Sequence, residues 1–197
     1  MGLIYLVRHG TTDWTLAGRL QGRTDIPLNS LGLEEAARLA RYLAGRRIDR
    51  VFTSPLLRAR QTAQVLGMAF GLTPEVHPDL QEMCFGSLEG LTRGELEAMI
   101  PGFRRRWQED PYSLTFPGGE SFAEVDDRVQ SHLRELMGRG DVATVVVTHG
   151  QVIRSGVRLS LGLPGKRRHC FALSHGSLTL MEYAAGRLRL LSLNVSP

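Results

Sequence analysis

The chain has 197 residues, of which 42% are hydrophobic and 22% are charged, and these values suit one globular domain with a core of its own. Its formal net charge of +4 is mild, and the arginines are spread along the chain apart from short basic clusters at 104–106 and 166–168, so no nucleic-acid-binding stripe is predicted. No stretch approaches the roughly 20 apolar residues of a membrane span.

The first predicted element is a short strand at Leu3–Val7, an unbroken apolar run of the kind that is buried on both faces of a sheet. Arg8 and His9 follow where this strand leaves the sheet, and Gly10 allows a sharp turn. Ligand crevices of open parallel sheets lie at the carboxyl ends of their strands. We therefore expect Arg8 and His9 to meet a small anion; taken alone, the pair also suits a strand that simply ends at the surface.

A long polar stretch at 11–29 comes next, and its length is typical of a functional loop. Gln21 and Gly22 lie within it, where backbone can close on a ligand. Asn29 offers an N-cap for a helix that Gly45 ends. The inward face of this helix is expected to carry Leu33, Ala36, Ala37, Ala40 and Leu43.

The next unit repeats the order of strand and helix. Arg50–Thr53 predicts a strand, and the Ser-Pro pair at 54–55 predicts an N-cap followed by proline at the first helical position. Arg58 lies in the first turn of that helix, at the same rim as His9. Arg60, two positions later, cannot face the same way. The order strand, helix, strand, helix favours a parallel sheet with helices on its faces.

The alternation is interrupted after a third short strand at Glu75–His77. A loop at 79–90 follows, which carries Glu82 and is called the acid loop below. Thr92 and Glu95 then form a capping box before a short helix. We interpret residues 83–119 as a helical cap inserted over the rim of a single domain spanning 1–197.

The last third of the chain returns to the sheet. A capping box at Ser121 opens a strongly amphipathic helix, which Gly138 and Gly140 are expected to end. Val142–Thr148 is the second strongly apolar strand, and it ends in His149 and Gly150 as the first ends in a His-Gly pair. Two alternating runs, Ser177–Tyr183 and Arg187–Leu193, are joined around Ala185-Gly186 and predict a terminal hairpin at the sheet edge.

Two buried strands thus deliver two His-Gly pairs and an arginine to one rim, and Arg58 adds a second arginine. The guanidinium fork suits a phosphoryl group. A neutral imidazole can attack phosphorus, and a protonated one can stabilise the equatorial oxygens. Glu82 is the candidate general acid if burial and the phosphate raise its pKa. A metal site of His9, His149 and Glu82 is an alternative that the two arginines disfavour, since they would repel a divalent cation.

The remaining histidines show no such placement, and we expect them to be surface or structural residues: His77, His132, His169 and His175. Glu89 and Glu95 are expected to be solvated or to cap helices.

A set of ordered motifs covers nearly the whole chain. They are Leu6-Val-Arg8-His9-Gly10-Thr-Thr, Gly18-Arg-Leu-Gln21-Gly22, Thr53-Ser-Pro-Leu-x-Arg58-Ala-x-Gln-Thr62, Leu80-x-Glu82-x-x-Phe-Gly-x-x-Glu-Gly90, and Pro117-Gly-Gly-Glu-Ser121 with Val146-Val-Thr-His149-Gly150. In this order they resemble the histidine phosphatase superfamily, the phosphoglycerate-mutase-like proteins. The resemblance implies an α/β fold in which helices flank both faces of a mostly parallel central sheet and a small helical cap follows the acid loop.

The resemblance also implies roles for single residues. His9 would be the phosphorylated nucleophile, and Arg8, Arg58 and His149 would form the phosphate pocket. Glu82 would donate a proton to the leaving group and later activate water. The family needs no metal, and we expect no cofactor.

Further residues are expected at the phosphate or substrate on the same basis: Thr15, Gln21, Gly22 and Gly150. Thr15 stands where relatives often carry asparagine. A shorter hydroxyl can still bond a phosphate oxygen, so this departure affects one contact rather than the chemistry.

The compact acid-loop segment with Pro117-Gly-Gly-Glu-Ser121 resembles the phosphatase branch, which includes alpha-ribazole, broad-specificity and metal-independent phosphoserine phosphatases. The run from Phe103 to Pro111 looks most like the phosphoserine type. A phosphoglycerate mutase is the first alternative, and a non-catalytic phosphate-binding protein is the second.

The expected partner is a small phosphate ester rather than a nucleic acid or a membrane, and we keep a homodimer open as the assembly. Two cysteines without a CxxC motif, and no signal peptide before the first strand, favour the cytoplasm.

Overall fold

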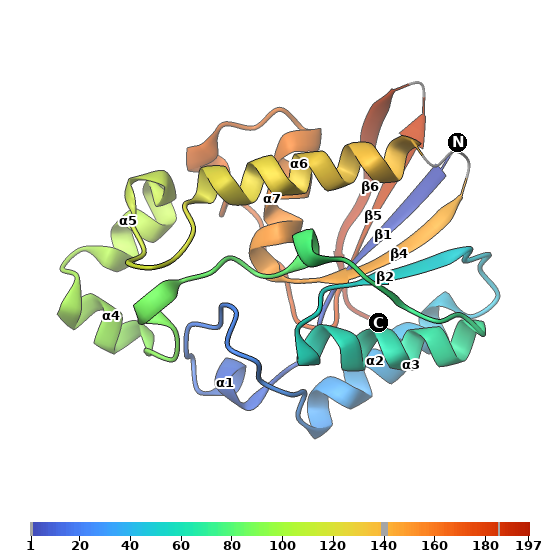
Figure 1. Ribbon diagram of the computed structural model, residues 1–197, viewed down its shortest axis with the longest axis horizontal. Helices are drawn as coiled ribbons and strands as arrows, with labels where there is room; N and C mark the ends of the chain where they lie inside the picture. Colours follow the sequence, from blue (N-terminus) through green and yellow to red (C-terminus); the bar gives the residue numbers. More distant parts are fainter. Residues whose placement is uncertain (1, 139–141, 185) are drawn as a thin grey trace.

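The computed structural model describes residues 2–138, 142–184 and 186–197 (Figure 1). Within these ranges the strands form one six-stranded sheet in the order β3-β2-β4-β1-β5-β6. Their bounds are β1 Gly2–Arg8, β2 Arg50–Thr53, β3 Glu75–Val76, β4 Ala143–Thr148, β5 Leu178–Ala184 and β6 Arg187–Val195. The pairs β1–β4, β4–β2 and β2–β3 are parallel, whereas β1–β5 and β5–β6 are antiparallel. The expected α/β fold with a mostly parallel sheet is confirmed.

The two strongly apolar strands, β1 and β4, lie side by side at the centre of the sheet. Their register pairs Leu3 with Ala143 and Arg8 with Thr148. Because the strands are parallel and in this register, His9 and His149 leave the sheet at the same edge. The backbone N–H of His9 donates to the carbonyl of Thr148 over 3.0 Å.

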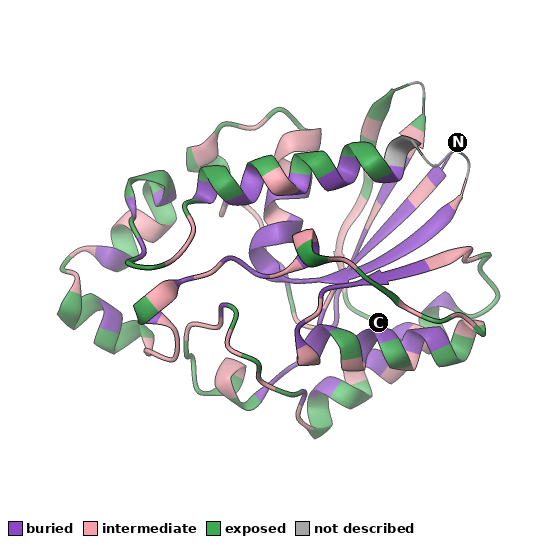
Figure 2. Ribbon diagram, viewed as in Figure 1, coloured by how far each residue is buried: buried purple, intermediate pink, exposed green. Residues whose placement is uncertain are grey.

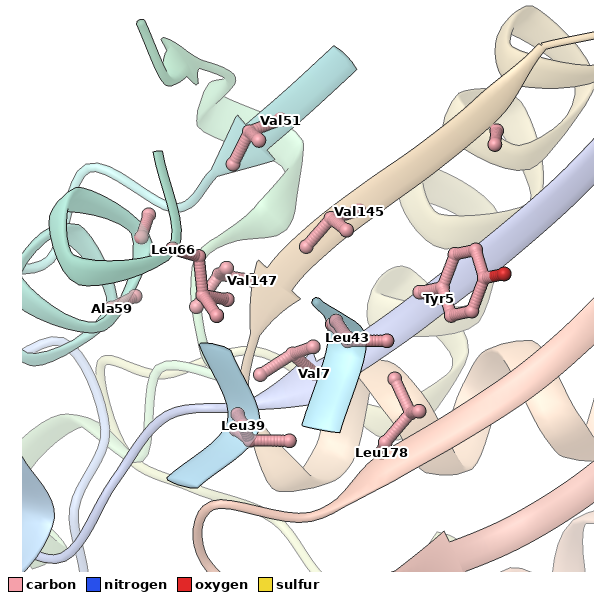
Figure 3. Packing of buried hydrophobic residues seen from close by; sticks show 12 residues of the cluster. Tyr5, Val7, Leu39, Leu43, Val51, Ala59, Leu66, Val145, Val147 and Leu178 are labelled. Carbon is pink, nitrogen blue, oxygen red and sulfur yellow. The ribbon is translucent and has the colours of Figure 1, made fainter. Parts of the chain in front are cut away.

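Helices cover both faces of the sheet (Figure 1). On one face α2 (Ser30–Leu43) and α3 (Leu57–Phe70) bury their apolar residues against Tyr5, Val7 and Val145, as Figure 3 shows. On the other face α6 (Phe122–Gly138) and α7 (Gly150–Ser160) cover the alternate strand residues, among them Leu6 and Val146. Side chains that alternate along β1 and β4 therefore contribute to two cores, one on each face of the sheet; β4 is buried throughout, and β1 is buried from Ile4 to Val7 (Figure 2).

The segment 83–119 contains the short helices α4 and α5. Phe103 and Phe116 are buried in this segment, and Trp107 and Phe116 pack against Phe122 at the start of α6. The remaining short helices are α1 Asp13–Leu16, η1 Pro78–Leu80, η2 Gly86–Leu88, α4 Arg93–Met99, α5 Phe103–Glu109, η3 Pro111–Ser113 and η4 Gly165–Arg167. No helix in the described part of the chain is long and apolar enough to cross a membrane.

Most of the helix starts that the sequence predicts from capping residues are confirmed. The side chain of Asn29 caps α2, and both capping boxes form, at Thr92 with Glu95 and at Ser121 with Glu124. The helix α6 reaches Gly138; the predicted stop at Gly140 and the hairpin tip at Ala185 lie outside the described residues.

Two predictions about these helices were wrong. Leu33 is exposed, and the buried face of α2 consists of Gly32, Ala36, Leu39 and Leu43. The cause is a close backbone approach at the start of the helix: a Cβ on Gly32 would lie 2.2 Å from the carbonyl oxygen of Thr11. With this glycine turned inward, the next residue, Leu33, points to solvent.

The expected N-cap at Ser54 is the second correction. The N-cap of α3 is Leu56, which makes no side-chain cap. The hydroxyl of Ser54 instead accepts from the N–H of Leu56 over 3.2 Å and contacts His149. The Ser-Pro pair therefore shapes the turn before α3 rather than its first residue.

Candidate active site

The candidate site lies at the rim where β1, β4 and β2 end. The imidazole rings of His9 and His149 have their centroids 5.0 Å apart, and both side chains are buried. Arg58 comes from the first turn of α3, which follows β2 directly. Parallel neighbours in the sheet thus bring together three side chains that are up to 140 residues apart in the sequence.

The hydrogen bonds of His9 determine which ring nitrogen carries its proton. Nδ1 lies 2.7 Å from the carbonyl oxygen of Gly10, which can only accept, so Nδ1 is protonated. Nε2 accepts from Nε of Arg58 over 3.3 Å. Burial, reinforced by the positive charge of Arg58, holds the pKa of His9 well below its ordinary value. His9 is therefore a neutral imidazole at pH 7 with its lone pair on Nε2.

Arg58 is completely buried, and its guanidinium also fixes the loop at 11–29. Nη2 donates to the carbonyl of Gly22 over 2.7 Å, and Nη1 donates to that of Thr24 over 3.0 Å. Arg60 is exposed, as helical geometry required. One arginine thus connects the ring of His9 to the loop that passes beside it.

Arg8 supplies a second positive charge. Its Nη1 donates to the carbonyl of Leu173 over 2.6 Å, while its Nε is buried without a partner among the described residues. Burial lowers the pKa of Arg8 to about 10, so the group stays charged at neutral pH. A Cβ on Gly150 would lie 3.5 Å from Cζ of Arg8, an ordinary van der Waals contact, so the guanidinium lies next to the start of α7.

The imidazole of His149 is buried, and only one of its two ring nitrogens has a hydrogen-bond partner in the part of the chain that the structure describes. Its Nε2 lies 2.8 Å from the hydroxyl of Ser54, and its Nδ1 has no hydrogen-bond partner within the described ranges. Burial, followed by the charge of Arg58, holds the pKa of His149 well below its ordinary value. An anion bound at the rim would offer Nδ1 an acceptor and would favour the protonated ring.

Glu82 lies in the acid loop and is buried against the start of α7. One carboxylate oxygen accepts from the N–H of Met83 over 2.9 Å, and both oxygens accept from the N–H of Gln151, over 3.2 and 3.3 Å. Burial is the largest influence and raises the pKa of Glu82, while the two N–H groups and Arg58 oppose it. A carboxyl of this kind can hold a proton nearer to neutral pH than an exposed glutamate.

Gln151 is itself held by Arg168, a residue that sequence reasoning did not single out. The guanidinium of Arg168 donates to the side-chain and backbone oxygens of Gln151, over 3.1 and 2.9 Å, and forms a 2.7 Å ion pair with Asp126. The chain of contacts Asp126–Arg168–Gln151–Glu82 therefore positions the carboxyl through α6 and α7. Its only sequence signal was a short basic cluster, which carries no information about burial.

Thr15 and Gln21 lie together in the loop at 11–29. Nε2 of Gln21 donates to the hydroxyl of Thr15 over 2.8 Å, and both side chains also contact Thr12. This network stabilises the turn around α1. Contact of these two side chains with a ligand remains a prediction.

His175 corrects the expectation that it is a surface or structural residue. Its ring centroid lies 5.4 Å from that of His9, and burial together with Arg8 and Arg58 lowers its pKa to about 3. The strand β5 is antiparallel to β1, so β5 begins at the edge where β1 ends. The available signal was a third His-Gly pair, His175-Gly176, directly before a predicted strand.

Glu89 is the second correction, because it is neither solvated nor a cap. Its carboxylate accepts from the N–H groups of Arg23, Thr24 and Phe85 over 2.8–3.0 Å, and so joins the loop at 11–29 to the acid loop. A Cβ on Gly22 would lie 1.9 Å from this carboxylate, which explains the glycine there. Glu95, in contrast, caps α4 as expected.

The assembled site is suited to an anion. Two arginines and three neutral imidazoles face one rim, with a single buried carboxyl beside them. A phosphoryl group would receive hydrogen bonds from guanidinium groups and imidazole N–H groups, and it would lie beside an unprotonated Nε2.

The chain is similar to known proteins over nearly its whole length. The model of the histidine phosphatase superfamily (branch 1) matches residues 4–196. Phosphoserine phosphatase 1 of Hydrogenobacter thermophilus is 31% identical over 194 residues, which cover 98% of this chain and 92% of that protein. A probable phosphoglycerate mutase, GpmB, of Serratia proteamaculans is 32% identical over 181 residues, which cover 91% of this chain and 84% of that protein.

Among solved structures, that of mycobacterial glucosyl-3-phosphoglycerate phosphatase Rv2419c with VO3 superposes with a TM-score of 0.92 at 32% identity and covers each chain completely. The chain spans about half the length of the mycobacterial relatives that match it at 37% identity over 184 residues.

Proposed function

This chain belongs to the histidine phosphatase superfamily, branch 1, and from that premise we propose that it is a metal-independent phosphomonoester hydrolase that works through a phosphohistidine at His9. The observation that carries the proposal is the state of the His9 ring. Nδ1 donates to the carbonyl of Gly10, so Nε2 is unprotonated; its lone pair accepts from Nε of Arg58 over 3.3 Å and becomes free to attack when a bound phosphoryl group takes over that guanidinium. A neutral imidazole held in this way is a nucleophile without further activation.

The first half-reaction transfers the phosphoryl group to the enzyme. Nε2 of His9 attacks phosphorus while the bond from phosphorus to the ester oxygen breaks. The arginines Arg8 and Arg58 and the ring of His149 stabilise the negative charge on the equatorial oxygens. Glu82, whose pKa burial raises, donates its proton to the leaving alkoxide. The products of this step are the free alcohol and the phosphohistidine.

The second half-reaction returns the enzyme to its starting state. Glu82 is now ionised and takes a proton from water, whose oxygen attacks the phosphohistidine. The bond between phosphorus and Nε2 breaks, and inorganic phosphate leaves. Two arginines supply the positive charge that a metal ion supplies in other phosphatases, so the reaction needs no cation.

The substrate is proposed to be a small phosphorylated metabolite, of the phosphoserine, alpha-ribazole phosphate or phosphoglycerate type. Two relatives are named as phosphatases, of phosphoserine and of glucosyl-3-phosphoglycerate. The helices at 93–109 would meet the part of the substrate beyond the phosphate, as a cap over a single domain. The cytoplasm, expected from the sequence, remains the proposed location.

The deciding experiment measures inorganic phosphate released from a panel of small phosphate esters in the presence of EDTA, with His9→Ala as the control for contaminating activity. We expect release from at least one ester by the wild type and none by His9→Ala. Faster interconversion of 2- and 3-phosphoglycerate than phosphate release would replace the proposal with the mutase function that the name of one relative suggests. Phosphate binding without turnover of any ester would establish a binding protein.

A further inference from the structure

A second group of titratable side chains lies apart from the site, on the face of the sheet that α6 covers. It consists of His77, directly after β3, with His132 and Glu135 on α6. One ligand atom from each residue can be chosen so that all lie within 4.8 Å of one another. The two helical residues are three positions apart, so they share one face of α6.

The spacing of these atoms approaches that of a metal centre. Nε2 of His77 lies 3.3 Å from a carboxylate oxygen of Glu135, and Nδ1 of His132 lies 3.8 Å from the same oxygen. Ligand bonds of 2.0–2.2 Å in a tetrahedral zinc site place neighbouring ligand atoms roughly 3.3 Å apart. The shorter of these two distances already has this value, and the longer needs a contraction of roughly half an ångström. The chosen ligand nitrogens of the two imidazoles lie within 4.8 Å of each other.

Of the three candidate ligands, His132 is fixed by packing, whereas His77 and Glu135 are partly exposed and can adjust their positions. His132 is buried, and its ring packs edge-on against Phe52 with the centroids 6.1 Å apart. The side chain of Glu135 is 45% exposed and that of His77 is 22% exposed, so both can shift by fractions of an ångström.

We propose that His77, His132 and Glu135 form a zinc-binding site. Two imidazole nitrogens and one carboxylate oxygen are a donor set that suits zinc, whereas magnesium and calcium prefer oxygen ligands alone. The bound ion would connect α6 to the chain between β3 and η1, five residues before Glu82. The site is distinct from the rim that holds His9, and its role is to stabilise this connection.

The test is a zinc titration of the chelator-treated protein, followed by calorimetry and by thermal unfolding. The wild type is expected to bind one zinc ion at micromolar concentration or below, and to gain about 5 °C or more in Tm at a hundredfold excess over Kd. Glu135→Gln and His77→Asn should each weaken binding at least tenfold and remove the gain in Tm. Both side chains are partly exposed, so these variants are expected to fold.

Three outcomes would overturn the proposal. Zinc bound equally well by wild type, Glu135→Gln and His77→Asn would show that these residues are not its ligands. Binding that is lost in His9→Asn and kept in Glu135→Gln would place the ion among the imidazoles of the rim. A lower Tm in Glu135→Gln with no zinc binding by the wild type would leave only an ion pair between His77 and Glu135.

Discussion

At the scale of single residues, the main feature of the site is that its charged and titratable side chains are buried: His9, Arg58, Glu82 and His149. Arg58 contacts the ring of His9 and two loop carbonyls, so it positions the proposed nucleophile and places a positive charge beside it. Arg60, on the same helix, is exposed and has no such role. This pair of arginines gives a matched test of the site.

We expect Arg58→Ala to lower kcat/KM by roughly a hundredfold or more, the scale of losing one electrostatic contact to the transition state. Arg60→Ala should stay close to the wild type. Both values come from initial rates of phosphate release, with circular dichroism to confirm that each variant is folded. Equal or larger damage from Arg60→Ala would show that the roles of the two arginines are reversed.

Glu82→Gln tests the proton donor. The amide keeps the shape of the side chain but cannot give or accept the proton, so we expect hydrolysis of alkyl phosphates to fall by roughly 10²–10⁴-fold. The loss on aryl phosphates should be smaller, because a phenolate leaves with less help from an acid. Binding of inorganic phosphate should be unchanged. If alkyl and aryl esters lose activity equally, the proton donor is another group.

The buried histidines make stability depend on pH. The pKa of His175 is lowered to about 3, whereas an unfolded histidine titrates near 6.5, so the unfolded chain binds this proton first as pH falls. The stabilisation that the neutral ring provides is therefore complete above about pH 6.5 and is lost as the pH falls toward 3. His9 and His149, whose pKa values are also lowered, act in the same direction, and Glu82, whose pKa is raised, acts in the opposite one.

The corresponding prediction uses His175→Asn, which cannot titrate. Urea unfolding at pH 7 and pH 5 should show that the variant loses less stability between these values than the wild type, by on the order of 1 kcal/mol. An equal loss in both proteins would mean that the ring of His175 is solvated in the folded state.

At the scale of elements, two loops complete the site, and Glu89 joins them. Its carboxylate accepts backbone N–H groups from the loop at 11–29 and from the acid loop. Burial acts to raise the pKa of Glu89, but the hydroxyl of Thr24 and these N–H groups together lower it. The loop at 11–29 carries the carbonyls that hold Arg58. Loss of this carboxylate would therefore disturb the site without touching the substrate.

We expect Glu89→Ala to lower kcat/KM at least tenfold, mainly by disordering the loop around Arg58. Glu95→Ala is the matched control, since Glu95 only completes the capping box of α4 and its loss should cost about 1 kcal/mol of stability with activity retained. Activity and urea unfolding measured on both variants separate the two effects. Full activity in Glu89→Ala would show that Arg58 alone holds the loop.

At the scale of the whole molecule, the proposed mechanism takes its positive charge from arginines rather than from a metal ion. We expect phosphate release at 25 °C to be unchanged by EDTA and not to increase when magnesium is added. Activity that EDTA abolishes and a divalent ion restores would contradict the proposed mechanism. Thermal unfolding in the same buffers keeps a loss of stability separate from a loss of chemistry.

The sequence by itself determined the features that depend on local patterns. Continuous apolar runs identified β1 and β4 as the central strands, because only a strand covered on both faces is apolar throughout. The His-Gly pairs at their ends placed two imidazoles at one rim, since parallel strands end at the same edge. The capping boxes formed as predicted because their contacts lie within one helical turn.

Only the tertiary structure decided which remaining residues join the rim. His175 reaches His9 because β5 runs antiparallel to β1, and the direction of an edge hairpin is not encoded in its alternating pattern. Glu89 and Arg168 act through partners far away in the sequence, so no local spacing reveals them. The proton on Nδ1 of His9 follows from the fold of the Gly10 turn, because a ring nitrogen takes its protonation state from the group that faces it.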